Sequence, residues 1–365
     1  MTPPDTLESH LARAVRTRVF PGGVLLAGNR REVLFERAFG RLDYEIGSAA
    51  PSATETLYDL ASLTKPLATA ALAALWFARG ELDLDERVGA MLPAAAGRPI
   101  GQVRIEHLLA HASGLPDWRP LYKELLGQGM EIPSPRSRDA LLELTLQVPL
   151  EAEPGVRRRY SDLDYIILGR LLERIGGQRL DVLVDKQLLR PRTADNARYF
   201  NLLASAEARS SDAARTAPSE SCPWRGRILR AEVHDDNAWT GGGVEGHAGL
   251  FAAAGAALSL ARLWLDAAHG HGPLAVAAAR FLPSGPTLGW DRPSEEGSQG
   301  GAHLGPDDFG HLGFTGTSVW IQPAAERIVV LLTNRVHPDR EDRGIAETRR
   351  LIHDAVHLQL SGGGA

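Results

Sequence analysis

The chain is poor in the features that would tie it to an oxidising compartment or to a polyanionic partner. One of its 365 residues, Cys222, is a cysteine, so no disulfide bond can form within the chain, which fits a reducing compartment. Aromatic residues make up only 6% of it. Acidic and basic residues are mixed along the chain without a long block of either sign, and they leave a net charge of −5. Nothing in this pattern favours a nucleic-acid partner.

Signals for export and for membrane insertion are also lacking. Residues 1–20 carry acidic residues, a histidine and three arginines, and they have no apolar stretch typical of a signal peptide. No apolar run approaches the length of a membrane span. We therefore expect a soluble, cytoplasmic protein without a membrane partner. The motif Gly-x-Ser-x-Gly is absent too, which disfavours an α/β-hydrolase.

Lysine is scarce, and its placement is informative. Of 40 Lys and Arg residues, only three are lysines, Lys65, Lys123 and Lys186. Lys65 ends the tetrapeptide Ser62-Leu63-Thr64-Lys65 and is followed by Pro66. Because proline has no N–H and fits only the first turn of a helix, the sequence predicts a helix that begins near Ser62.

This position suits a nucleophile. The spacing i, i+3 places Ser62 and Lys65 on one face of the helix, and the positive field of the helix N-terminus favours an attacking alkoxide. A desolvated lysine can lose its proton near neutral pH, whereas an arginine cannot, so a lysine kept here in an arginine-rich chain indicates a base. The alternative is a capping serine followed by a solvated lysine, which the tetrapeptide alone does not exclude.

The order of the predicted elements indicates an α/β fold of the α+β kind. Apolar periodicity predicts helices over 7–19, 68–79, 105–110, 139–147, 164–175, 250–268 and about 341–360. Strand-like runs occupy 24–27, 32–36, 316–322 and 327–334. We therefore expect an antiparallel sheet that is flanked by helices and built from both chain ends, with a helical region inserted between them.

Four segments occur in an order that is specific, although each alone is weak. They are 57–67 with its Ser-x-x-Lys, 108–116 (Leu-Leu-Ala-His-Ala-Ser-Gly-Leu-Pro), Tyr160-Ser161-Asp162 after Pro154-Gly155, and 310–318 (Gly-His-Leu-Gly-Phe-Thr-Gly-Thr-Ser). Together they resemble the motifs of the serine β-lactamase and penicillin-binding-protein superfamily. Within it they are most similar to class C β-lactamases, family VIII carboxylesterases and D-aminopeptidases. The resemblance covers residues from about 8 to 360.

The resemblance implies a β-lactamase/transpeptidase-like fold with two domains. Residues 1–85 and 245–365 would form an α/β sandwich, residues 86–244 a mainly helical domain, and the active site would lie between them. Neither a cofactor nor a metal is implied.

The resemblance also implies roles for single residues. Ser62 would be the acylated nucleophile, and Lys65 and Tyr160 would activate it and later protonate the leaving group. The backbone N–H groups of Ser62 and Phe314 would form the oxyanion hole. His311 would replace the lysine of the third motif, and Gly313 would contribute to substrate binding at the same strand.

Two positions depart from the family pattern. Asp162 replaces the asparagine of the second motif, and its negative charge would favour the ammonium form of Lys65, which would shift the role of base toward Tyr160. Leu312 replaces a threonine whose hydroxyl helps to hold the β-lactam carboxylate. His311, unlike lysine, is largely neutral near pH 7. Leu312 and His311 thus argue for short-chain esters over penicillins and cephalosporins.

The sequence therefore predicts a serine hydrolase that acts through an acyl-enzyme on small ester or amide substrates, with short-chain esters and D-amino-acid peptides as candidates and weak β-lactam hydrolysis. A β-lactamase or D-alanyl-D-alanine carboxypeptidase proper is the first alternative. A catalytically silent binding protein is the second, because of Asp162. Natural substrate, partner proteins and oligomeric state do not follow from the sequence.

Other motifs carry less information. The stretch 241–246 matches Gly-x-Gly-x-x-Gly, but no apolar strand precedes it, so we interpret it as a loop. His247, just after it, is a candidate for substrate contact or indirect support of the site, and a plain loop histidine is the alternative. His107 and His111 have metal-ligand spacing, to which His234, Asp235 and Asp236 could add ligands, but a structural role is favoured for all of them.

Overall fold

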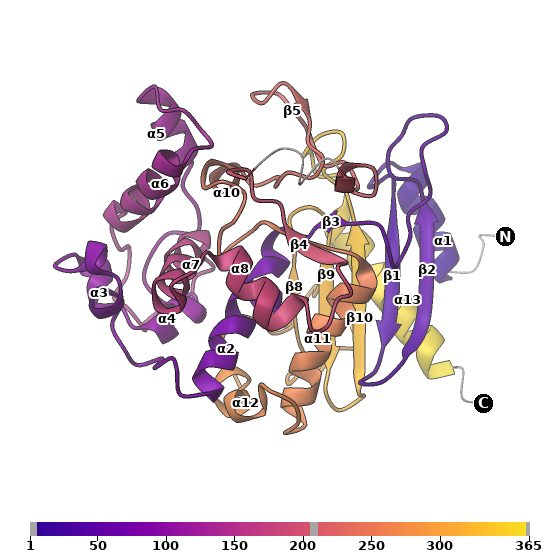
Figure 1. Ribbon diagram of the computed structural model, residues 1–365. Coiled ribbons are helices and arrows are strands. Elements are labelled where there is room, and N and C mark those ends of the chain that lie inside the picture. The colour runs from indigo at the N-terminus through magenta and orange to yellow at the C-terminus, as the bar shows by residue number, and fades with distance from the viewer. Residues whose placement is uncertain (1–5, 205–210, 363–365) are drawn as a thin grey trace.

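The computed structural model describes residues 6–204 and 211–362 of the chain (Figure 1). A five-stranded sheet lies on one side and most of the helices lie on the other. Residues 205–210, which fall in the predicted helical domain, lie outside the described residues. The two-domain division itself stays a prediction, because one hydrophobic core runs through the sheet side and the helical side.

The sheet is antiparallel and joins both chain ends, as the sequence predicts. Its strands follow the order β2-β1-β10-β9-β8. Their bounds are β1 Gly22–Gly28, β2 Val33–Gly40, β8 Phe309–Leu312, β9 Ser318–Gln322 and β10 Arg327–Thr333. The two central strands β1 and β10 are almost wholly apolar because both faces of the sheet are covered.

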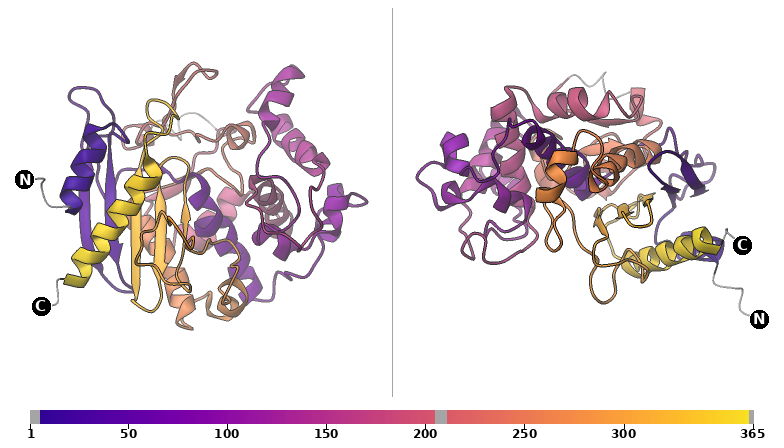
Figure 2. Two further views of the ribbon diagram at one scale, coloured as in Figure 1. Left: turned by 180° about the vertical axis from the view of Figure 1, so that it is seen from behind. Right: turned by 90° about the horizontal axis from the view of Figure 1, so that it is seen from below.

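Alternate residues of the central strands bury against different helices. Leu25 and Leu331 pack with α1 (Leu7–Arg16) and α13 (Ile345–Gly362), which lie side by side on one face (Figure 2). Leu26 and Val330 belong to the main core on the other face, which α11 (Ala254–Ala268) covers. This period of two sets the register of the sheet.

The remaining helices and short strands surround the main core. The helices are α2 Ala70–Ala78, α3 Val88–Met91, α4 Ile105–Leu109, α5 Leu121–Gly127, α6 Pro135–Gln147, α7 Asp162–Gly176, α8 Leu180–Val184, α10 Asp236–Thr240 and α12 Ala278–Phe281. The short strands are β3 Tyr58–Asp59, β4 Ala197–Tyr199, β5 Ser221–Cys222, β6 Arg227–Ile228 and β7 Leu250–Ala252.

Several predicted boundaries are wrong for identifiable reasons. Residues 250–252 form strand β7 between β3 and β4, not the start of a helix, and α11 begins at Ala254, because a short apolar run does not distinguish a strand from a helix. Helix α6 begins at Pro135 because Ser134 caps it by accepting the Ser137 N–H at 3.0 Å. Helix α5 was not predicted at all.

One further expectation about the chain needs correction. The helical segment Ala61–Ala78 is long and apolar enough to cross a membrane by length and composition, although no such run was recognised in the sequence. It is 83% buried inside the protein. It therefore serves as the central core helix, and its apolar character follows from burial on all sides.

A buried ion pair joins helix α7 to the segment that precedes His247. Arg170 Nη2 lies 2.6 Å from Glu245 Oε1, and both side chains are almost fully buried. We expect Glu245→Ala to lower the free energy of unfolding by about 3–5 kcal/mol, because the guanidinium stays buried without this partner. Urea denaturation followed by circular dichroism measures the free energy of unfolding of the variant and of the wild type.

The matched control is Glu8→Ala, which removes an exposed pair with Arg37. It should change the free energy of unfolding by no more than about 1 kcal/mol. Equal effects of the two variants would show that the buried pair does not hold α7 to this segment.

Candidate active site

Ser62 lies in the turn that leads into the central core helix. Ala61–Leu63 form one 3-10 turn, a π-helical turn spans Lys65–Thr69, and α2 continues from there. Ala61 has a left-handed backbone with φ of +46°, which costs a residue other than glycine about 1–3 kcal/mol. The carboxylate of Asp59 holds this turn by accepting the Ala61 N–H at 2.8 Å.

Lys65 is the hub of the site. Its side chain is fully buried, and Nζ lies 3.0 Å from Ser62 Oγ, 2.6 Å from the Tyr160 hydroxyl and 2.6 Å from Asp162 Oδ1. The carbonyl oxygen of His247 is a fourth neighbour at 3.1 Å. An ammonium has three protons for these four oxygens, so the donated hydrogen bonds can exchange as protons move.

Tyr160 completes a triangle with Ser62 and Lys65. Its hydroxyl donates to Ser62 Oγ at 2.7 Å and lies 3.2 Å from Asp162 Oδ1. Burial raises the pKa of Tyr160 well above its usual range, and the negative charge of Asp162 adds to this effect. The phenol is therefore neutral at physiological pH and can accept a proton only while it passes its own proton on.

His111, from the second resembling segment, fixes the position of Tyr160. Its carbonyl accepts the Arg159 N–H at 2.7 Å, and its Nδ1 accepts the Ser161 N–H at 3.1 Å. The two rings are in contact, with centroids 4.7 Å apart. Burial lowers the pKa of His111 well below its usual range, so the ring is neutral, as an acceptor at Nδ1 must be.

Strand β8 and the turn after it form the opposite wall. Gly313 leaves room for its neighbours, since a Cβ there would meet Thr317 Oγ1 at 2.0 Å. Thr317 and Thr315 donate their hydroxyl protons to the carbonyl oxygens of Leu60 and Asp59 at 3.1 and 2.6 Å, which ties the turn to the segment before Ser62. Phe314 stays half-exposed at the mouth.

His311 lines a neighbouring pocket instead of the main cleft, and its ring centroid lies 6.0 Å from that of Tyr160. Its Nδ1 donates to the Leu312 carbonyl at 2.9 Å, and burial lowers its pKa, so the imidazole is neutral. Its Nε2 is buried, and no hydrogen bond from the described residues reaches it. Leu312, in contrast, lines the cleft beside Ser62.

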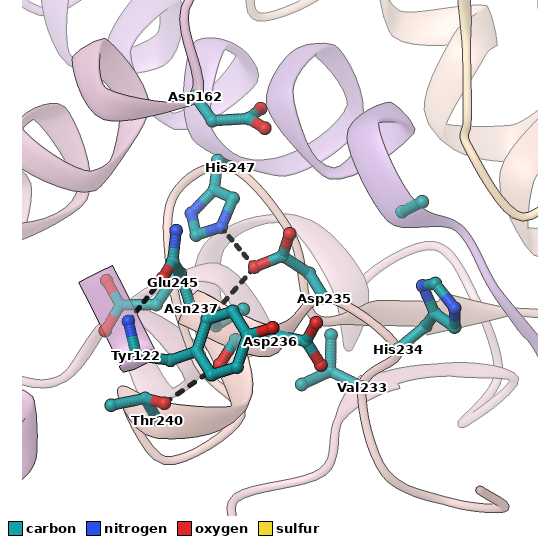
Figure 3. Close-up of polar contacts among 12 residues, drawn as sticks. Tyr122, Asp162, Val233, His234, Asp235, Asp236, Asn237, Thr240, Glu245 and His247 are labelled. Carbon is teal, nitrogen blue, oxygen red and sulfur yellow. Dashed lines mark hydrogen bonds and ion pairs between the residues drawn. The ribbon is translucent and has the colours of Figure 1, made fainter. Parts of the chain in front are cut away.

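A buried histidine, His247, pairs with the partly exposed carboxylate of Asp235 (Figure 3). His247 Nε2 lies 2.8 Å from Asp235 Oδ1. Burial opposes the imidazolium, but the charge of Asp235 outweighs it and raises the pKa of His247. The sequence indicates His247 as a contact candidate but offers Asp235 only as a possible metal ligand, because the polar stretch around Asp235 has no recognisable motif.

Ser62, Tyr160 and Asp162 line a cleft of about 500 Å³ together with Asp235 and His247. The cleft also contains Arg335, Arg340 and Arg349, none of which the sequence analysis considered. The expected preference for esters without a carboxylate rests on His311 and Leu312 alone, and these three guanidinium groups bear on the same question. The sequence did not distinguish them from the many other arginines of the chain. Arg335 lies just after β10, Arg340 lies in the loop that follows, and Arg349 lies on helix α13.

The histidines with metal-ligand spacing do not form a metal site. Across residues 6–204 and 211–362, no group of three His, Cys, Asp or Glu side chains is arranged to hold a metal ion. His111 is instead committed to Tyr160 and Ser161, as described above.

Comparison with known proteins places this geometry in a family. The family model described as Beta-lactamase matches residues 7–354. The N-acetylmuramyl-L-alanine amidase of Bacillus subtilis (strain 168) is 30% identical over 347 residues, which cover 87% of this chain and 78% of that protein.

Solved structures share the fold over nearly the whole chain. EstCE1, a hydrolase with promiscuous acyltransferase activity, superposes with a TM-score of 0.72 at 21% identity and covers 96% of this chain and 97% of its own. The LovD6 mutant of simvastatin synthase from Aspergillus terreus gives 0.71 at 21% identity, with 98% and 97% covered.

The chain belongs to the β-lactamase family. It is a serine hydrolase of that family, and the resemblance seen in the sequence is confirmed. The antiparallel sheet built from both chain ends is the fold of its structural neighbours.

Asp162 offers a direct test of the proton network. Because its charge contributes to the raised pKa of Tyr160, Asp162→Asn should lower that pKa. NMR titration of protein labelled with [¹³Cζ]tyrosine measures the shift, and Tyr160→Phe identifies the resonance. An unchanged titration would place Asp162 outside the network.

Proposed function

We propose that the protein hydrolyses amide or ester bonds through an acyl-enzyme on Ser62, and that its substrates carry a carboxylate in the leaving group. The triangle of Ser62, Lys65 and Tyr160, with all three pairs within 3.0 Å, carries the proposal. It also speaks against a catalytically silent binding protein, since a purely binding site has no need for a buried lysine on a serine hydroxyl.

In the first step, Ser62 Oγ attacks the carbonyl carbon of the substrate. The backbone N–H groups of Ser62 and Phe314 stabilise the developing oxyanion, and the tight packing at Gly313 keeps this wall close to the nucleophile. The tetrahedral intermediate then collapses to the acyl-enzyme and expels an amine or an alcohol. Water later attacks the acyl-enzyme and releases the acid.

The proton of Ser62 must reach a base, and Asp162 supplies one. Lys65 Nζ lies 2.6 Å from this carboxylate, and the phenol of Tyr160 is neutral. A proton from Ser62 can therefore pass to Tyr160 or Lys65 while either of them gives a proton to Asp162 Oδ1. The same path in reverse protonates the leaving group, so in this chain Asp162 adds a proton acceptor where the family pattern has an amide.

Arg335 and Arg349 support a substrate carboxylate. Both are more than nine-tenths buried, line the cleft and hydrogen-bond to carbonyl or amide oxygens, and no ion pair within the described residues includes either. Burial lowers the pKa of Arg349 to about 9, which leaves it charged at neutral pH. Buried charge without a counter-ion is costly, and a carboxylate would relieve that cost.

Two similar proteins agree with different candidate classes of substrate. The Bacillus subtilis relative is named as an amidase, which agrees with amide substrates. EstCE1 is described as a hydrolase with acyltransferase activity, which agrees with neutral esters as a second candidate class. The short-chain ester preference predicted from His311 and Leu312 is therefore retained as this second candidate.

The experiment that tests the acyl-enzyme uses thioesters whose released thiol is measured by a chromogenic disulfide. Ser62→Ala should reduce hydrolysis of S-heptanoyl thioglycolate to the uncatalysed rate, while circular dichroism stays that of the wild type. The one cysteine of the protein, Cys222, is buried and adds little background. Substantial hydrolysis by Ser62→Ala would contradict the assignment.

Lys65→Arg separates proton transfer from charge. The guanidinium keeps the positive charge but cannot exchange its proton near neutral pH, so kcat/KM should fall by about 10²–10⁴-fold. Lys123→Arg, a change of the same kind outside the cleft, should stay near the wild type. Normal turnover by Lys65→Arg would show that Lys65 supplies only charge.

Arg335 decides between the two substrate classes. We expect wild-type protein to prefer S-heptanoyl thioglycolate, which has a carboxylate, over the matching carboxamide by about tenfold or more, as charged hydrogen bonds are worth about 1.5–3 kcal/mol. Arg335→Gln should reduce that ratio, and Arg37→Gln on strand β2 should not. A preference for the carboxamide in the wild type would favour neutral esters.

A further inference from the structure

We propose that Asp235 binds a protonated amine on the acyl part of the substrate, so that the natural substrates carry both an ammonium and a carboxylate. The inference rests on the proposed function and adds a specificity-determining residue to it. The substrate class is then a peptide, or an amino-acid-derived ester or amide, with a free amino group.

Asp235 presents an open oxygen to the cleft. Its Oδ1 accepts the Ala238 N–H at 2.7 Å and lies 2.8 Å from His247 Nε2. Its Oδ2 points away from His247 (Figure 3), and the hydrogen bonds and the ion pair of this side chain in the described part of the chain all end on Oδ1. The side chain is 23% exposed and lines the cleft, so a ligand has access to this oxygen.

The carboxylate is held in place before any ligand arrives. It caps helix α10 through Ala238, and the imidazole of His247 holds the same oxygen from the other side. His247 is 1% exposed, and its Nδ1 has no hydrogen-bond partner in the described residues. The hydrogen bond of His247 therefore orients the Asp235 carboxylate, whose charge in turn raises the pKa of His247.

The neighbouring carboxylates are committed elsewhere. Asp236 Oδ1 accepts from the Arg225 guanidinium at 2.7 Å and from the Trp224 indole at 3.1 Å. Asp162 is paired with Lys65. An ammonium that enters the cleft would therefore meet the open oxygen of Asp235, and a charged donor makes a hydrogen bond about twice as strong as a neutral one.

The positions of the charged groups assign the ammonium to the acyl part. The ring of Phe314, beside the expected oxyanion hole, stacks on His234 with centroids 5.6 Å apart and lies 4.3 Å below the guanidinium carbon of Arg335. Asp235 follows His234 in the chain. With the carboxylate of the leaving group at Arg335, the acyl part extends toward His234 and Asp235.

The test compares two thioesters that share one leaving group. S-(6-aminohexanoyl) thioglycolate and S-heptanoyl thioglycolate differ in a terminal ammonium against a methyl group. We expect wild-type kcat/KM to favour the ammonium substrate by about tenfold, after the spontaneous rate is subtracted. Asp235→Asn, which keeps the size and the capping oxygen, should bring the ratio close to one.

The control is Asp117→Asn, which removes the same charge from an exposed carboxylate paired with Arg159. It should keep the wild-type ratio. Equal kcat/KM for both thioesters in the wild type, or an unchanged ratio in Asp235→Asn, would overturn the inference. If Asp235→Asn does not fold, the ratio of kcat/KM for the two thioesters in the wild type still tests whether the ammonium is preferred.

The outcomes separate this inference from the proposed function. Hydrolysis of both thioesters that depends on Ser62 but ignores the ammonium would refute the role of Asp235 alone. Hydrolysis of neither thioester above the rate of Ser62→Ala would refute the proposed function itself.

Discussion

The burial of the Lys65 ammonium is the constraint on which the rest of the site depends. A charge with no access to water must find its oxygens within the protein, and here they come from three separate parts of the chain. The Asp162 carboxylate and the Tyr160 phenol lie at the start of α7, and the carbonyl oxygen belongs to His247. The Ser62 hydroxyl lies one turn before Lys65 in the same helical segment. Satisfying one buried ammonium therefore assembles the nucleophile, its proton carriers and the cleft wall at the same time.

A second set of contacts ties this hub to the sheet. Asp59 holds the strained Ala61 turn and also accepts the His234 N–H at 2.7 Å, so one carboxylate connects the nucleophile to the segment that bears Asp235. Thr315 and Thr317 anchor the turn after β8 to the same stretch. The geometry around Ser62 is thus set by rigid elements of the core, as precise positioning of a nucleophile requires.

Local sequence patterns were enough to predict the start of the core helix and the order of the main sheet elements. The proline after Lys65 predicts the start of the core helix, and the order of the strand-like runs and helices predicts the sheet built from both ends; the structure has both. The strand at 250–252 could not be recognised, since its partners β3 and β4 are distant in sequence. Arg335, Arg349 and the place of Asp235 in the cleft could not be predicted for a related reason, because only tertiary packing distinguishes a buried unpaired arginine or an open carboxylate from the many solvated ones.

The central claim is that Ser62 is a nucleophile activated by its buried lysine. Treatment of the protein with a fluorophosphonate, followed by peptide mass spectrometry, tests it most directly. The account predicts one adduct, on Ser62, which forms rapidly in the wild type and far more slowly in Lys65→Arg. An adduct on another residue, no adduct at all, or equal labelling rates in the two proteins would contradict it.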